Sequence, residues 1–167
     1  DLRRRAAEQF LRKGRYAQGW QVMRSVLESL DVPIPSSSTG SLMSASSRRF
    51  SNLFLGKLTS APKGDAVALE PIEKLRADAL WSVATGFSSV DVTLTDPFLQ
   101  RYLQSARAFA DPSMLSRALG LEAVTLSFLG GWFGGKSRQA QQLAEQMAKQ
   151  SGDPYDRAWV FTSRAIG

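Results

Sequence analysis

The sequence predicts an all-α protein made of antiparallel helical hairpins. Apolar residues recur at helical spacing along most of the 167-residue chain, which is typical of helices that bury one face. Asp-Pro dipeptides precede three of these segments, and Asp followed by Pro is a strong helix-start signal. No segment shows convincing period-2 alternation. The short VDVTLT stretch at 90–95 is compatible with a strand, but equally with a loop.

The first thirty-odd residues predict two amphipathic helices, at about 2–13 and 16–30, joined by a Gly-Arg-Tyr turn. Each helix carries an apolar stripe for the other: Leu2, Ala6, Ala7, Phe10 and Leu11 in the first, and Trp20, Met23, Val26, Leu27 and Leu30 in the second. Small residues, among them Gly19, stand where the two helices would cross closely. A hairpin this short cannot bury its apolar face alone, so we expect it to be the first unit of a stack.

Further helices are expected downstream, at about 41–56, 71–90, 97–110, 112–129, 137–151 and 154–166. Three of them follow the dipeptides Asp96-Pro97, Asp111-Pro112 and Asp153-Pro154, and Glu70-Pro71 is a weaker version of the same signal. In each case the acidic side chain would accept a backbone N–H, which stabilises a helix start by about 1 kcal/mol. Proline fits the next position because no intrahelical donor is needed there.

Two segments lack such signals. Pro33 and Pro35 end the second helix and lead into a serine-rich stretch, and LTSAPKGD at 58–65 forms a second break. We expect mobile loops at about 31–40 and 58–69. The length fits one helical-repeat domain over 1–167. Because the chain begins inside an apparent helix and stops soon after another one starts, we expect it to be a fragment of a longer protein.

The composition excludes several kinds of chemistry. The chain has no cysteine and no histidine, so disulfides, zinc–thiolate sites, thiol nucleophiles and histidine-dependent catalysis are excluded. Ser82, Thr85, Ser88 and Asp91 gather on one predicted helix, but no histidine or lysine lies near enough in sequence to activate a nucleophile. We expect these four residues to form a polar seam between helices. We therefore predict no catalytic residue, no metal and no cofactor for this segment.

Membrane insertion is not expected either. No stretch approaches the roughly twenty apolar residues that a membrane span needs, and no signal-peptide pattern opens the chain. We expect a cytoplasmic protein without membrane contact.

The net charge is +6, and much of the excess lies in the first fifteen residues, at Arg3, Arg4, Arg5, Arg12, Lys13 and Arg15. A basic domain is compatible with binding to nucleic acid or to an acidic partner. Here the arginines share helices with an apolar stripe, and no base-stacking aromatics interleave with them, so we favour a solvated face. Arg4, Glu8 and Arg12, spaced four residues apart, would then form exposed ion pairs of about 0.3–0.5 kcal/mol each.

One motif resembles a phosphate-binding loop. GGWFGGKS at 130–137 matches the pattern G-x-x-x-x-G-K-[ST] through Gly130, Gly135, Lys136 and Ser137. In such a loop Lys136 would reach the terminal phosphates and Ser137 the magnesium ion. However, the preceding 112–129 segment reads as a helix and not as the required buried strand. We therefore favour a turn between two helices, with Trp132 and Phe133 as hydrophobic plugs and the glycines ending the first helix.

The first hairpin is similar to a tetratricopeptide repeat. Its small and aromatic residues stand at the repeat's usual places, with a turn and a following proline that also fit: Ala6, Ala7, Phe10, Gly14, Tyr16, Gly19, Val26 and Pro33. Arg3 replaces the usual Trp and Gly19 the usual Ala, so the repeat is degenerate. The hairpin at 112–151 resembles another repeat, with Ala123, Ala140 and Ala144 at the small positions and a longer turn. This resemblance implies a right-handed α-α superhelix.

A wider resemblance rests on the succession LRRRAAEQ, LDVPIP, WSVATGFSSVD, SRALGLEA and GDPY. It is similar to a region of large bacterial signalling proteins, in which a serine/threonine protein kinase domain precedes an AAA-like ATPase module and a long tetratricopeptide-like array. The resemblance implies that the parent protein is an ATP-dependent kinase. The kinase's own glycine-rich and catalytic-loop motifs are absent from this sequence.

These observations predict a non-catalytic interaction segment of such a kinase. A concave groove built by the first helices of the hairpins would bind a peptide, a partner protein or another domain of the parent chain. Repeat positions that face ligands correspond to Arg4, Glu8 and Arg12. Two alternatives stay open: a nucleotide-binding segment that uses the loop at 130–137, and a basic nucleic-acid-binding module.

Overall fold

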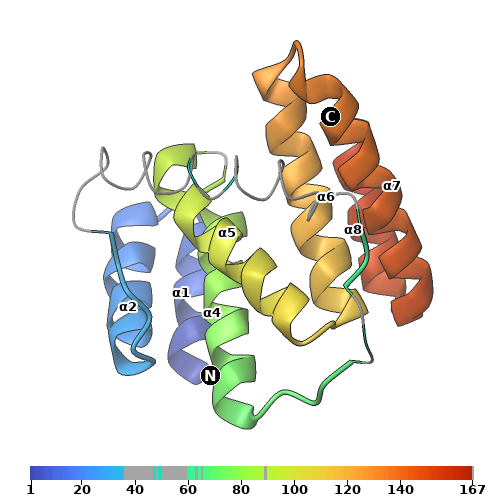
Figure 1. The fold of residues 1–167 in the computed structure, drawn as a ribbon. Helices are drawn as coiled ribbons and strands as arrows, with labels where there is room; N and C mark the ends of the chain where they lie inside the picture. Colours follow the sequence, from blue (N-terminus) through green and yellow to red (C-terminus); the bar gives the residue numbers. More distant parts are fainter. Residues whose placement is uncertain are drawn as a thin grey trace. The chain divides into compact units, whose positions relative to one another are not determined.

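The computed structural model describes residues 1–35, 47, 49, 60–62, 64, 66–88 and 90–166. Over these residues the regular secondary structure is α-helical, without a strand, and includes seven helices with defined bounds, so the predicted all-α class is confirmed (Figure 1). The helices are α1 (Leu2–Arg12), α2 (Tyr16–Ser29), α4 (Pro71–Gly86), α5 (Val92–Ala108), α6 (Pro112–Leu129), α7 (Phe133–Ser151) and α8 (Pro154–Ile166). The right-handed superhelix stays a prediction.

The chain divides into two compact units. The first comprises Asp1–Ser47 and Leu69–Tyr102, and the second Arg48–Ala68 and Leu103–Gly167. Most of the helix expected at 41–56 lies outside the described residues, as do parts of the loops expected at 31–40 and 58–69. Of the first of these loops 31–35 are described, and there Val32 is buried and its N–H donates to the carbonyl oxygen of Leu27.

In the first unit, α1 packs against both α2 and α4, the blue and green helices that lie side by side in Figure 1. Leu11 of α1 reaches two glycines at once. A Cβ added to Gly19 of α2 would stand 2.6 Å from Leu11 Cδ2, and one added to Gly86 of α4 would stand 2.5 Å from Leu11 Cδ1. These two glycines therefore allow three helices to meet around one leucine.

The buried face of α1 differs from the expected one. Ala7 and Leu11 are buried, as expected, but Leu2 is 84% exposed and Ala6 is exposed as well. The reason is that α1 contacts two helices and not one, which brings the polar positions Arg4 and Glu8 onto the packing side. The stripe expected on α2 is confirmed from Met23 to Leu30, and Trp20 stacks edge-on against Phe87 and Phe98.

In the second unit, α6 and α7 form an antiparallel hairpin, and α8 packs against both helices. The close contact between α6 and α8 lies at Gly120. A Cβ added there would stand 3.0 Å from Ser163 Oγ and 3.1 Å from the indole nitrogen of Trp159. That indole N–H donates to the carbonyl oxygen of Arg117 at 3.1 Å. The stripe predicted for α7, Ala140, Leu143, Ala144 and Met147, is buried.

Two charged pairs lie inside the second unit. Arg49 donates to both carboxylate oxygens of Glu122, at 2.6 and 3.0 Å, and the Glu122 side chain is fully buried. Arg117 Nε donates to Asp156 Oδ1 at 2.6 Å, and this carboxylate is also fully buried. Buried charges need such partners because transfer out of water is costly. Both pairs therefore link residues of the second unit that are distant in sequence.

The Asp-Pro signals predicted two helix starts correctly and one wrongly. Asp111 accepts the N–H of Met114, and Asp153 accepts the N–H of Tyr155, as expected for N-caps. By contrast, α5 begins at Val92, where Asp91 accepts the N–H of Leu94, and Pro97 lies inside the helix. Residues 95–100 are all buried, so tertiary packing outweighs the cost of an interior proline. The strand or loop considered at 90–95 is thus mostly the first turn of α5.

Smaller differences concern helix ends. The helix expected at 71–90 ends at Gly86, and the helix expected from 137 begins at Phe133. The spans 112–129 and 154–166 agree with α6 and α8. Within the described part of the chain, no helix has the length and apolar character that crossing a membrane requires.

Candidate partner-binding site

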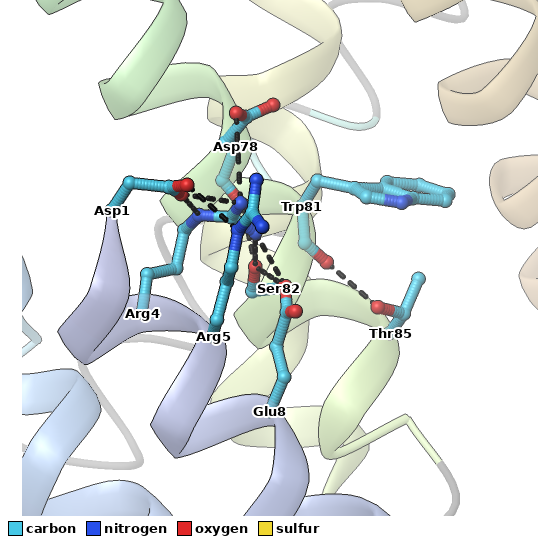
Figure 2. Close-up of polar contacts among 8 residues, drawn as sticks. All are labelled: Asp1, Arg4, Arg5, Glu8, Asp78, Trp81, Ser82 and Thr85. Carbon is cyan, nitrogen blue, oxygen red and sulfur yellow. Dashed lines mark hydrogen bonds and ion pairs between the residues drawn. The ribbon is translucent and has the colours of Figure 1, made fainter.

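The sequence-predicted residues Arg4 and Glu8 belong to a polar cluster between α1 and α4 (Figure 2). Arg4 Nη1 contacts Glu8 Oε1 at 2.5 Å, and Arg4 Nη2 contacts Asp1 Oδ1 at 2.8 Å. From α4, Ser82 accepts a hydrogen bond from Arg4 at 3.2 Å, and Asp78 lies 3.8 Å from the guanidinium. The Arg4 side chain is only 14% exposed. This arginine therefore joins two helices instead of extending into solvent.

Few polar atoms of Arg4 and Glu8 remain available to a ligand, because they already form hydrogen bonds within the cluster. Glu8 accepts from the Ser82 hydroxyl at 2.5 Å as well as from Arg4, and the Asp78 carbonyl oxygen, 2.7 Å from Ser82 Oγ, is a second acceptor within reach of the same hydroxyl. Arg12, one turn further along α1, is exposed. The prediction that these three residues bind a partner stays a prediction. Of the three, Arg12 has the accessibility that a ligand contact requires.

The residues of the predicted polar seam, Ser82, Thr85, Ser88 and Asp91, form both interhelical and local hydrogen bonds. Ser82 is buried and bonds across to α1, whereas Thr85 donates to the carbonyl oxygen of Trp81 and Ser88 to that of Thr85. These bonds satisfy hydroxyl groups locally along the chain. The buried position of Ser82 leaves its oxygen without access for a substrate.

The motif at 130–137 forms the turn between α6 and α7, as the favoured interpretation predicted. Gly130 and Gly131 have positive φ angles of 64° and 54°, and α7 begins at Phe133. Gly135, Lys136 and Ser137 thus lie inside the first turns of α7. The N–H groups of Phe133 and Gly134 donate to the carbonyl oxygens of Gly130 and Gly131.

This geometry differs from that of a phosphate-binding loop. Such a loop follows a strand and directs its backbone N–H groups at the phosphates, whereas this turn follows α6 and two of its N–H groups are bonded to turn carbonyls. The Ser137 hydroxyl donates to the Ala123 carbonyl oxygen of α6 at 2.8 Å. The expectation that both aromatic residues plug the turn is wrong for Trp132, which is 61% exposed and contacts the Phe133 ring edge-on.

A pocket of about 440 Å³, lined mostly by polar residues, lies in the second unit, where α6, α7 and α8 meet. Most of its lining comes from α7, together with one residue of α6 and two of α8: Ala123, Ser137, Arg138, Gln141, Gln142, Glu145, Ser163 and Arg164. Two arginines and one glutamate give this lining a net charge of +1. The volume is in the range of ordinary ligand pockets.

Sequence reasoning identified two of the pocket residues, Ala123 as a small packing position and Ser137 as part of the glycine-rich motif, but neither as part of a pocket. The polar residues of α7 follow the solvent-facing positions of an amphipathic helix, which by itself indicates only exposure. Their convergence with Ser163 and Arg164 depends on where α8 packs. No group of acidic residues suited to hold a metal ion occurs in the described segments, which contain neither cysteine nor histidine.

Comparison with known proteins finds no family model that matches this chain, and no curated protein or solved structure with significant similarity to it.

Proposed function

We propose that this chain is a non-catalytic protein–protein interaction segment, built of degenerate tetratricopeptide-like hairpins. We further propose that it belongs to the regulatory region of a cytoplasmic bacterial serine/threonine protein kinase. Its role is recognition: the stacked helices present side chains to a peptide, to a partner protein or to another domain of the parent chain.

The observation that supports this proposal most strongly is a packing arrangement that occurs in both units. In each unit one helix packs against its hairpin partner and also against a later helix. Glycine lies at the close contacts: Gly19 and Gly86 around Leu11 in the first unit, and Gly120 beside Trp159 in the second. Stacking of this kind is how helical repeats bury a continuous core while they expose an extended binding surface.

The pocket in the second unit is a candidate location for such a binding surface. It is open to solvent, lined by polar side chains of successive helices, and large enough for parts of a peptide. The absence of cysteine and histidine from the sequence also favours recognition over catalysis, because it removes the commonest general base and thiol nucleophiles.

Selection from a random peptide library tests the interaction function. With the folded chain as bait, we expect enrichment of peptides that bind saturably in calorimetry. An unrelated helical protein of equal net charge serves as the control bait. If no peptide binds this chain more tightly than the control, the proposal is wrong.

The sequence of the full-length gene product tests the placement in a kinase. We expect an N-terminal domain with a glycine-rich loop over the phosphates and a catalytic-loop Asp. Flanking domains of another class would contradict this part of the proposal without affecting the interaction function.

A further inference from the structure

We infer that the pocket between α7 and α8 binds a carboxylate side chain of an acidic peptide. This inference rests on the proposed function and names the chemical class of its ligand. Three features of the pocket carry it: a floor of small residues, an excess of hydrogen-bond donors, and two arginines on different helices that face one hollow.

The hollow exists because small residues lie where the three helices meet. Ala123 of α6, Ser137 of α7 and Ser163 of α8 line it. Internal hydrogen bonds hold these helices in place: Ser137 donates to the Ala123 carbonyl oxygen at 2.8 Å, and Gln141 Nε2 donates to the Val160 carbonyl oxygen at 3.0 Å. The floor is therefore formed before any ligand binds, which reduces the entropic cost of binding.

Donors outnumber acceptors among the side chains that remain available. Arg138 is exposed and forms no ion pair with any residue in the described part of the chain. Arg164 contacts Glu145 at 3.4 Å, and its side chain is 71% exposed. The Gln141 amide uses one of its two N–H groups on Val160. A ligand that accepts hydrogen bonds and carries negative charge complements this set.

A carboxylate fits the two arginines better than a neutral group does. Guanidinium groups bind carboxylates through paired N–H···O bonds, and charge-assisted bonds are about twice as strong as neutral ones. Arg164 already donates one hydrogen bond to a carboxylate of the same chain, that of Glu145. An acidic residue of a partner peptide would take the place opposite Arg138 and share or replace the Glu145 contact.

Fluorescence anisotropy with a labelled peptide of alternating Glu and Ala tests the inference. We expect saturable binding to the whole chain, and at least about tenfold weaker binding of the matched peptide of alternating Gln and Ala. Arg138→Gln and Arg164→Gln should each raise the Kd by about three- to tenfold. Circular dichroism should show unchanged folding, because both side chains are exposed.

Arg157→Gln is the matched control variant. Arg157 is an exposed arginine of α8 that does not line the pocket, so its loss removes the same charge from the same helix. Its Kd should stay within about twofold of the original value. If it weakens binding as much as Arg138→Gln does, attraction to the overall positive charge explains the result and the inference is wrong.

Two further outcomes would also overturn the inference. The first is binding of the neutral peptide as tight as that of the acidic one. The second is displacement of the acidic peptide by inorganic phosphate more effectively than by acetate at equal ionic strength, which would assign the pocket to phosphate groups. Failure here is distinguishable from failure of the proposed function. If library-selected peptides bind the chain but are insensitive to Arg138→Gln, the interaction function stands and only this pocket assignment falls.

Discussion

Glu122 lies fully buried in α6, and Arg49 donates to both of its carboxylate oxygens. The two residues are 73 positions apart in sequence, so the pair links Arg49 to α6 in the second unit. Removal of one partner would take from the other buried charge the paired hydrogen bonds that offset its burial, and that loss costs much more than the pair itself contributes.

Glu122→Ala should therefore lower the free energy of unfolding by about 3–5 kcal/mol. Urea denaturation followed by circular dichroism measures the change. The double variant Arg49→Met with Glu122→Leu should regain most of the loss, because it replaces the pair with apolar side chains of similar size. A single variant as stable as the original chain would show that the pair does not stabilise the fold.

Arg4 shows how the role of a charged residue depends on its neighbours. Its spacing with Glu8 was compatible with a solvated ion pair, and this pair is present at 2.5 Å. However, α4 covers the same face of α1 and adds Asp78 and Ser82, so the arginine is largely buried. Helical periodicity gives no information on which third helix approaches.

At the scale of helices, the contact among α1, α2 and α4 depends on the absence of side chains at two positions. Leu11 is confined from two sides because its methyl groups face Gly19 and Gly86. A methyl group added to either glycine would therefore push Leu11 toward the other helix. In α7, by contrast, a Cβ added to Gly135 meets no atom within 4 Å.

Gly19→Ala should lower the free energy of unfolding by about 1 kcal/mol. Overpacking against Leu11 costs about 1–3 kcal/mol and outweighs the gain of about 1 kcal/mol in helix propensity. Thermal and urea unfolding measure the difference.

Two comparisons check this explanation. In a Leu11→Ala background the same Gly19→Ala change should be close to neutral, because the two closest contacts, both with Leu11, are gone and the 3.3 Å contact with the Ala7 carbonyl oxygen remains. Gly135→Ala should stabilise the chain by up to about 1 kcal/mol. If Gly19→Ala stabilises the original chain as Gly135→Ala does, Leu11 does not limit the approach of these helices.

At the scale of the whole molecule, two compact units of helices and a net charge of +6 characterise the chain. The pattern match at 130–137 is the feature that most directly suggests another function. Its Gly130, Gly135, Lys136 and Ser137 lie in a turn and the first turns of a helix, and Ser137 is bonded back to α6. This arrangement does not offer a row of free N–H groups to phosphates.

Titration with ATP and magnesium should accordingly show no saturable binding that depends on Lys136. Calorimetry of the original chain and of Lys136→Ala measures this directly, and weak binding of equal strength in both would reflect the positive charge of the chain. Saturable binding that Lys136→Ala abolishes would favour the nucleotide-binding alternative over recognition of a protein partner.

Much of the architecture is encoded locally. Helical periodicity and the absence of alternating segments established the all-α class, and Asp111-Pro112 and Asp153-Pro154 located the starts of α6 and α8. The turn at Gly130 was also foreseeable, because a helical pattern precedes it. These features depend on hydrogen bonds and backbone preferences within a few residues of each position, so neighbouring residues suffice to predict them.

The rest depends on contacts between segments that are distant in sequence. The side of α1 that is buried, the start of α5 ahead of Pro97, the Arg49–Glu122 pair and the pocket beside α8 all result from helices that meet only in the folded chain. Burial and pairing energies of several kcal/mol act at these contacts and exceed local preferences of about 1 kcal/mol or less. A helix pattern shows that a face will be covered, but the packing of the complete chain determines what covers it.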